Sequence, residues 1–261
     1  MTDTWSNAVV SQVRAVSGRP AKASTPQEVW AGLSAAVVDH IADDWASTDR
    51  TYKAGRMEHY FSAEFLMGRA LLNNLSNLGL VEQARTSLNA GYGILYRYGL
   101  FKQLFENGFQ TEHPDSWMEE GYPFIVRRQE EQRLVSYADM TVRAIPYDMP
   151  ITGYGTKNVN TLRLWKAEPL EEFDYDAFNS QRFTDAIVER EHAMDISRVL
   201  YPNDTTYEGK VLRVRQQYFF CSASLQDIVA NYIERHGTDL RGLSDFNAIQ
   251  LNDTHPVLAI P

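Results

Sequence analysis

The segment 57–79, MEHYFSAEFLMGRALLNNLSNLG, constrains the fold more than any other part of this sequence. It starts as a short strand, turns near residues 64–68, and continues as a helix that Gly79 closes. A strand that leads through such a turn into a helix is an α/β unit, and ligands gather at the carboxyl ends of such strands. By residue type alone, Glu64 and Arg69 beside the turn indicate an exposed ion pair.

Polar residues also follow a second predicted strand. The segment 246–251, FNAIQL, is typical of a buried strand, and residues 252–256 come at its carboxyl end. A carboxylate and an imidazole two residues apart, Asp253 and His255, leave open metal binding, acid–base catalysis or a structural hydrogen-bonded pair. No further His or Cys cluster supports a metal site, so the residue types favour the structural pair.

The polar turn at 202–206, PNDTT, separates two segments that are predicted to be helical, 176–200 and 211–235. Asn, Asp and Thr side chains bond their own backbone in such turns, so the local pattern indicates an ordinary helix–loop–helix connection. The first helix has Phe183, Ile187 and Val188 as its apolar positions. The periodicity of the second helix predicts one buried face, formed by Val211, Val214, Tyr218, Cys221, Leu225, Ile228 and Tyr232.

The other elements follow from local signals. Residues 1–24 are polar, with weak helical character, and are expected to form a loose start. Thr25, Pro26 and Glu28 then predict a capped helix start, and its apolar stripe is Val29, Trp30, Leu33, Ala36, Val37, Ile41 and Trp45. Alternation at 133–137 and 140–145 predicts an antiparallel hairpin. A loop is expected after it, and then a strand through 162–165.

Composition narrows the class of protein. The 261 residues suit one large or two small domains, and 44% hydrophobic with 23% charged residues is typical of a soluble globular chain. A net charge of −9 argues against binding to nucleic acid or to anionic membranes. The single cysteine, Cys221, excludes an intrachain disulfide, and the N-terminus lacks a secretory signal. The protein is therefore expected in the cytoplasm.

Four segments together resemble a known family. They are ISRVLYPNDTTYEGKVLRVRQQYF, SAEFLMGR, GYGILYRYGLFKQLFENGFQ and LNDTHP, and the similarity runs from about residue 26 to residue 261. All four are similar to segments of the glycogen, starch and maltodextrin phosphorylases, here the α-glucan phosphorylases. The resemblance implies the N-terminal, Rossmann-like half of a GT-B fold: an α/β domain with a parallel-centred sheet, helices on both sides, and a small antiparallel appendage near 124–150. It divides the chain into a loose segment 1–24 and a partial domain 25–261.

The resemblance also implies an activity and a set of site residues. The reaction is the reversible phosphorolysis of α-1,4-glucan by inorganic phosphate to glucose 1-phosphate. The residues that would line the glucan pocket are Glu64, Arg213, Asp253 and His255, with Asp204 and Thr205 on a mobile gate, while Leu66 would touch the cofactor. Thr205 departs from the muscle-type enzymes, which carry asparagine there. Carboxylate, imidazole and guanidinium groups suit the binding of sugar hydroxyls.

Parts that the family's chemistry requires are missing from this sequence. The cofactor is pyridoxal 5′-phosphate, held by a lysine in the family's C-terminal domain, and none of the six lysines has a matching context. The family's Gly-Asn-Gly-Gly-Leu-Gly-Arg loop, which would present backbone N–H groups to phosphate, is absent, with a seam at Ala90 and Gly91. Residue 261 is interpreted as a truncation point. We therefore expect the N-terminal part of a phosphorylase or, alternatively, an inactive fragment that binds glucan weakly, and the resemblance leaves a homodimer open.

Overall fold

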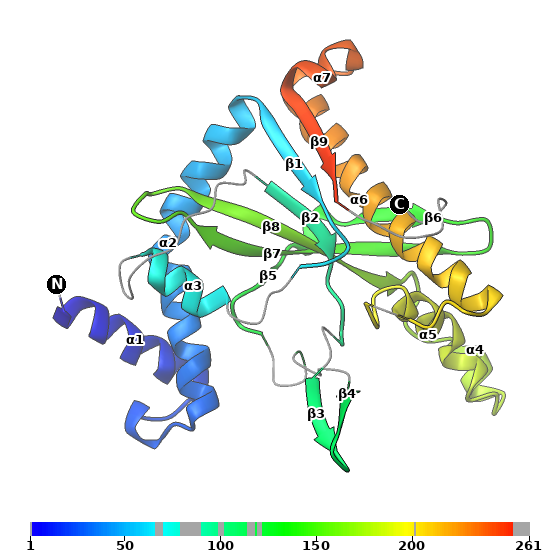
Figure 1. Cartoon of the computed structure of the whole chain (residues 1–261), viewed down its shortest axis with the longest axis horizontal. Coiled ribbons are helices and arrows are strands. Elements are labelled where there is room, and N and C mark those ends of the chain that lie inside the picture. Colours follow the sequence, from blue (N-terminus) through cyan, green and yellow to red (C-terminus); the bar gives the residue numbers. More distant parts are fainter. Residues whose placement is uncertain are drawn as a thin grey trace.

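The computed structural model describes residues 2–65, 70–78, 90–98, 102–113, 118, 122–200 and 202–252. Helices and a twisted sheet make up most of this part of the chain (Figure 1). The α-helices are α1 (Thr2–Ser17), α2 (Pro26–Ala54), α3 (Ala70–Asn77), α4 (Tyr175–Asn179), α5 (Val188–Asp195), α6 (Tyr207–His236) and α7 (Leu243–Phe246). Short 3-10 turns occupy Ala21–Ala23, Gln129–Glu131, Asp185–Ile187 and Leu240–Gly242.

The main sheet is mixed, with strand order β5-β7-β8-β2-β1-β9 and β6 paired to β7. The pairs β8–β2, β2–β1 and β1–β9 are parallel, whereas β7 is antiparallel to β5, β6 and β8. Its strands are β1 (Met57–Phe61), β2 (Ala90–Ile94), β5 (Val126–Arg127), β6 (Arg133–Ser136), β7 (Thr141–Thr152), β8 (Val159–Pro169) and β9 (Asn247–Leu251). A separate two-stranded antiparallel sheet consists of β3 (Lys102–Glu106) and β4 (Phe109–His113).

Helices cover both faces of the main sheet, as an α/β domain requires. Side chains alternate across β8, so Trp165 packs with Phe219 and Phe220 of α6, while Leu164 packs with Val37 of α2 and Leu71 of α3. The sequence-based prediction of an α/β chain with helices on both sides is confirmed. The parallel strands form only one half of the sheet, and the antiparallel strands continue it rather than forming a separate appendage.

The long antiparallel strand β7 corrects one prediction. Its hairpin with β6 is confirmed, but the loop expected from residue 146 onward is instead the second half of β7, paired with β8 up to Thr152 and Val159. The strand tolerates Pro146 and Pro150 because of the direction in which they face. Their carbonyls accept hydrogen bonds from Arg128 N and Asn74 Nδ2, which are not part of β8. Their nitrogens face the same way as these carbonyls, away from β8, so no hydrogen bond of the β7–β8 ladder is lost.

The start of the chain contains more regular helix than its composition predicts. The predicted capping box of α2 is present, since Thr25 N donates to Glu28 Oε2 at 2.7 Å and Glu28 N donates to Thr25 Oγ1 at 3.3 Å. Residues of weak helical character form α1, whose Val13 is buried at Gly32 of α2, where a Cβ would lie 2.5 Å from Val13 Cγ2.

Two helical predictions differ from the structure. The segment 176–200 is interrupted rather than one helix, and Phe183 and Val188 are exposed, while Ala186 and Ala193 are buried. Helix α6 exists and ends at Gly237 (φ 80°) as predicted, but it buries a different face. Of its predicted buried residues, Ile228 and Tyr232 are buried, whereas Val214, Tyr218 and Leu225 are exposed. Five of the ten buried residues of α6 are instead polar: Arg213, Gln216, Gln217, Ser224 and Asp227.

The predicted seam at Ala90 and Gly91 lies in the interior of the sheet, because β2 pairs with β1 on one side and β8 on the other. A Cβ on Gly93 would lie 2.7 Å from Ser62 O and 2.8 Å from Phe65 Cδ2, so glycine allows the Phe65 ring to pack against this strand. The last strand of the described sheet is β9, which was predicted to be buried. The prediction of a strand is confirmed, but its burial is wrong, since Leu251 is 63% exposed.

Candidate functional site

The carboxyl ends of the parallel strands bring several predicted site segments to one edge of the sheet. Glu64 is exposed and comes directly after β1, in a turn where its N–H donates to Ser62 Oγ at 3.1 Å. Asn252 follows β9, and its N–H donates to Phe61 O at 2.8 Å, extending the β1–β9 pairing by one residue. The chain that leads to Asp253 and His255 therefore leaves the sheet beside the turn that carries Glu64.

Helix α6 reaches the same edge because it runs antiparallel to the parallel strands (Figure 1). Its Phe220 packs on Phe61 at the carboxyl end of β1, with 6.3 Å between ring centroids, while Tyr232 lines a cavity with His59 nearer the amino end. Arg213 lies about two turns before Phe220, roughly 10 Å along the helix axis. The first turns of α6 thus lie toward the strand ends that carry Glu64.

The turn that precedes α6, the gate segment 202–206, is stabilised by hydrogen bonds that its own side chains make. Asn203 Oδ1 accepts hydrogen bonds from Thr205 N at 2.9 Å and Thr205 Oγ1 at 2.8 Å, which is an Asx turn. Thr206 caps the helix by accepting from Gly209 N at 3.2 Å. Thr205 is exposed and Asp204 is half-buried. Both of these predicted gate residues therefore have solvent-accessible surface.

The predicted site residues differ in what the structure says of them. Glu64, Asp204, Thr205 and Arg213 belong to elements that converge on the carboxyl edge, and Arg213 is buried, with Nη1 donating to Leu200 O at 2.9 Å. Leu66, Asp253 and His255 lie outside the described residues. Their convergence with Glu64 on one glucan pocket stays a prediction.

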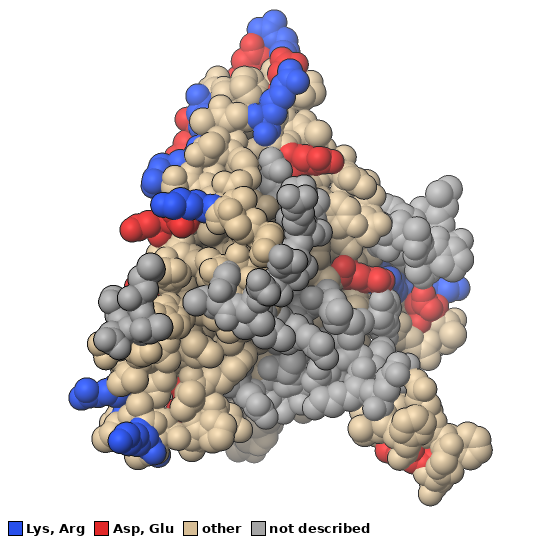
Figure 2. Space-filling model, turned by 60° about the vertical axis from the view of Figure 1, so that its left-hand side comes forward, with Lys and Arg blue, Asp and Glu red and all other residues tan. Residues whose placement is uncertain are grey.

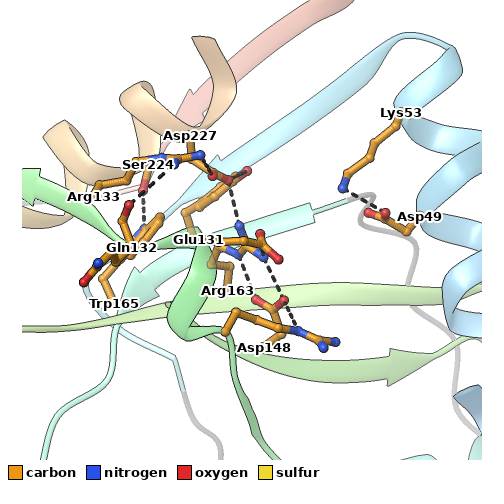
Figure 3. Close-up of polar contacts among 12 residues, drawn as sticks. Asp49, Lys53, Glu131, Gln132, Arg133, Asp148, Arg163, Trp165, Ser224 and Asp227 are labelled. Carbon is orange, nitrogen blue, oxygen red and sulfur yellow. Dashed lines mark hydrogen bonds and ion pairs between the residues drawn. The ribbon is translucent and has the colours of Figure 1, made fainter. Parts of the chain in front are cut away.

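A cavity of about 480 Å³ lies at the opposite, amino edge of the parallel strands, between α2 and α6. None of the predicted site residues that the structure describes lines it. Figure 3 shows the ion network in its wall, in which Arg163 donates to both carboxylate oxygens of Asp148, each at 2.8 Å. Arg163 also contacts Asp227 at 3.0 Å and Glu131 at 2.7 Å, and Arg133 contacts Asp227 at 2.8 Å.

The positive and negative charges of this network are equal in number. Arg128 joins it through Asp148 at 3.3 Å, so three arginines face three carboxylates, and Asp227 Oδ2 also accepts from Tyr92 Oη at 3.2 Å. Burial is the largest single effect and would lower the pKa of Arg163, but the hydrogen bonds to Asp148 and the negative charges of Asp148 and Asp227 together outweigh it and raise that pKa well above its ordinary value. Burial, followed by the nearby Asp227 charge, raises the pKa of Tyr92 well above its ordinary value. Asp148, Arg163, Tyr92 and Asp227 thus form a buried ionic core.

Beside this network lies His59, whose buried environment should make the folded protein less stable in mild acid. Its Nε2 contacts Asn247 Oδ1 at 2.9 Å, its buried Nδ1 has no partner among the described residues, and burial lowers its pKa from 6.5. The folded state therefore keeps His59 neutral, whereas the unfolded chain binds a proton as the pH falls below 6.5, which favours unfolding. Between about pH 7.5 and about pH 5.5, urea unfolding should show a larger loss of stability in the wild type than in His59→Gln. An equal loss in both proteins would contradict this assignment.

The surface and the helices limit other classes of site. On the described part of the face in Figure 2, acidic and basic side chains are interspersed, and no continuous basic surface is visible there. Among the described residues, no helix is long and apolar enough to cross a membrane, and no group of three His, Cys, Asp or Glu side chains could hold a metal ion.

Sequence reasoning missed the residues whose polarity conflicts with their burial. Asp148 and Arg163 stand inside apolar strand sequences, and Gln216 and Asp227 stand on what was predicted to be the polar face of α6. A charged residue within an otherwise apolar strand was the available signal for the ionic core. No comparable signal marks Gln216, because a glutamine on a helix is most often solvent-exposed.

An α/β chain with polar turns at the carboxyl ends of parallel strands is a typical scaffold for ligand binding, and comparisons with known proteins define the class further. The family model for carbohydrate phosphorylase matches residues 80–261. The chain is 32% identical to a glycogen phosphorylase of Chlamydia pneumoniae, covering 99% of this chain and 39% of that protein. It is 34% identical to the liver form of glycogen phosphorylase of Homo sapiens, and that alignment covers 91% of this chain and 36% of the human protein. The chain belongs to the carbohydrate phosphorylase family and is homologous to the N-terminal part of glycogen phosphorylases.

The alignments also bear on the missing segments. The chain spans well under half the length of these relatives. The alignment with the Chlamydia pneumoniae protein extends over 320 residues, whereas this chain has 261, so at least 59 positions of that relative have no counterpart here.

The lysine side chains that the structure describes do not fit the family's cofactor. A Schiff-base lysine needs a buried amine that is free to lose its proton. Of the lysines whose side chains the structure describes, Lys22, Lys157 and Lys210 are exposed. Lys53 pairs with Asp49 at 2.8 Å, and Lys166 pairs with Glu168 at 3.3 Å. No step of a reaction is therefore assigned to pyridoxal phosphate held by these residues.

Proposed function

We propose that this chain forms the glucan-binding wall of an α-1,4-glucan phosphorylase, corresponding to the N-terminal, Rossmann-like half of a GT-B fold. The observation that carries the proposal is the meeting of the β1 turn, the end of β9 and the first turns of α6 at one edge of the sheet. Each of these segments carries, or leads to, residues that the resemblance assigns to the family's glucan pocket. The substrates of the complete enzyme would be α-1,4-glucan and inorganic phosphate, in the cytoplasm.

Each residue of the proposed site has a role that its chemistry supports. The carboxylates of Glu64 and Asp253 would accept hydrogen bonds from sugar hydroxyls, and His255 would donate or accept one. Asp204 and Thr205 would close over the glucan from the gate segment. Arg213 offers a planar set of donors, although its Nη1 is already bonded to the backbone.

Glucan binding without catalysis is the second candidate for residues 1–261 acting alone. The specific observation in its favour is the combination of the absent glycine-rich loop with lysines that are exposed or ion-paired wherever the structure describes their side chains. Pyridoxal phosphate supplies the proton-donating phosphate in this family, so a chain that cannot hold it would bind substrate but leave the glycosidic bond intact.

Replacing Glu64 by glutamine tests the proposed site. A sugar hydroxyl bonded to a carboxylate loses the charge-assisted part of that bond, so the affinity for maltoheptaose should fall about tenfold. Glu58→Gln is the matched control, because Glu58 is an exposed carboxylate near the amino end of β1, the strand that leads into the turn with Glu64. Calorimetric titration of both variants is the measurement. Equal affinities for Glu64→Gln and the wild type would remove Glu64 from the site.

A further inference from the structure

The segment Ser197 to Leu200, which leads toward the gate segment, is held from two sides. On one side, Arg97 N donates to Ser197 O at 3.0 Å, and Tyr98 N donates to Arg198 O at 2.9 Å. Tyr98 and Val199 form an isolated parallel β-bridge. This backbone contact fixes the segment to the continuation of β2 at the carboxyl edge of the sheet.

On the other side, two buried side chains of α6 hold the next carbonyls. Gln216 Nε2 donates to Val199 O at 2.8 Å, and Arg213 Nη1 donates to Leu200 O at 2.9 Å. Arg213 Nη1 also donates to Gln216 Oε1 at 3.3 Å, so the two side chains support one another. Gln216 is fully buried and Arg213 is 5% exposed. Because both donor side chains are buried, water would not replace them, and a carbonyl that lost its donor would be left without a hydrogen bond.

The gate segment itself packs against the same helix. A Cβ on Gly209 would lie 1.9 Å from Asn203 O, so glycine alone lets the gate backbone fold directly against the first turn of α6. Thr206 then begins the helix with its cap. Helix α6 thus holds the chain shortly before the gate segment through the Arg213–Gln216 pair, and contacts the gate segment itself at Gly209.

We propose that Gln216, together with Arg213, is a positioning residue that sets the conformation of the gate segment 202–206 and thereby controls the access of a glucan to the carboxyl edge. Gln216 acts through the Val199 and Leu200 carbonyls and does not touch the glucan. The inference rests on the proposed function for the identity of the ligand, but not for the coupling between Gln216 and the gate.

Three variants test this coupling by hydrogen exchange. Gln216→Met keeps the side-chain length and removes the donor, so the amides between residues 199 and 206 should exchange about tenfold faster, with the central strands unchanged. Gln216→Glu cannot donate to Val199 O while it is ionised, but it can when protonated. Its exchange should therefore be fast at neutral pH and return toward wild type in acid, a pH profile that Gln216→Met lacks. Gln226→Met, on an exposed part of α6 where Gln226 donates to Leu134 O, should leave the gate unchanged.

Each outcome supports or overturns the inference. Unchanged exchange at 199–206 in Gln216→Met, or acceleration spread evenly over the sheet, would overturn it. If Gln216→Met does not fold, the pH profile of Gln216→Glu decides. The affinity for maltoheptaose should change in Gln216→Met and not in Gln226→Met, and faster gate exchange with unchanged affinity would contradict control of access. If the wild type binds no maltoheptaose, the proposed function fails, and the exchange data still decide the coupling.

Discussion

Replacing Arg163 by leucine is expected to destabilise the protein by about 3–5 kcal/mol. Arg163 is 9% exposed and donates hydrogen bonds to Asp148, which is 4% exposed, and to Asp227, which is 1% exposed. Leucine would leave two buried carboxylates with fewer partners, and an uncompensated buried charge costs more than the ion pair itself contributes. With total stabilities of about 5–15 kcal/mol for a typical domain, this loss would be a large fraction of the whole.

Urea unfolding of Arg163→Leu and of a matched variant measures this effect. Arg241→Leu is the control, because Arg241 also pairs with a carboxylate, that of Asp239, but its side chain is 90% exposed. The control should unfold at the wild-type urea concentration, since exposed ion pairs contribute little. A stability of Arg163→Leu within about 0.5 kcal/mol of wild type would show that the ionic core is not required for the fold.

The second large effect is the complete absence of phosphorolysis by residues 1–261. The purified chain should show no Schiff-base absorbance after incubation with pyridoxal phosphate, and should release no glucose 1-phosphate from maltodextrin and phosphate. The physical reason is the lack of a buried, unpaired lysine among the lysine side chains that the structure describes, together with the lack of the glycine-rich phosphate loop.

A full-length glycogen phosphorylase is the positive control for both assays. Stoichiometric cofactor that borohydride traps on any of the six lysines would overturn the prediction, and so would measurable glucose 1-phosphate. Weak, substoichiometric labelling of Lys22 or Lys210 would not, because exposed lysines react slowly with any aldehyde.

Local signals in the sequence predicted local structure well. The capping box at Thr25, the β6–β7 hairpin and the end of α6 at Gly237 are confirmed because each depends on a few neighbouring residues. Burial was predicted less well. The stripe of α6 with Val214 and Tyr218 is apolar but exposed, because the face that packs on the sheet combines Phe219 and Phe220 with polar residues whose partners are distant in sequence.

Asp227 and Arg163 illustrate the difficulty, since they are 64 residues apart along the chain and meet only in the folded sheet. Gln216 is similar, because its partner is the carbonyl of Val199 in a segment without regular helix or strand. Periodicity cannot reveal such pairs. The candidate site was predicted from its resemblance to a family, and the structure adds that the segments after β1 and β9 leave the sheet side by side.

The site itself is tested most directly by mapping where a glucan binds. The measurement is hydrogen exchange of residues 1–261 with and without maltoheptaose at a saturating concentration. We expect protection at residues 62–65, at the gate segment 202–206 and from residue 252 onward, and loss of that protection in Glu64→Gln. Protection confined to the cavity between α2 and α6, around Trp45 and Asn231, or no protection anywhere, would contradict a glucan site at the carboxyl edge.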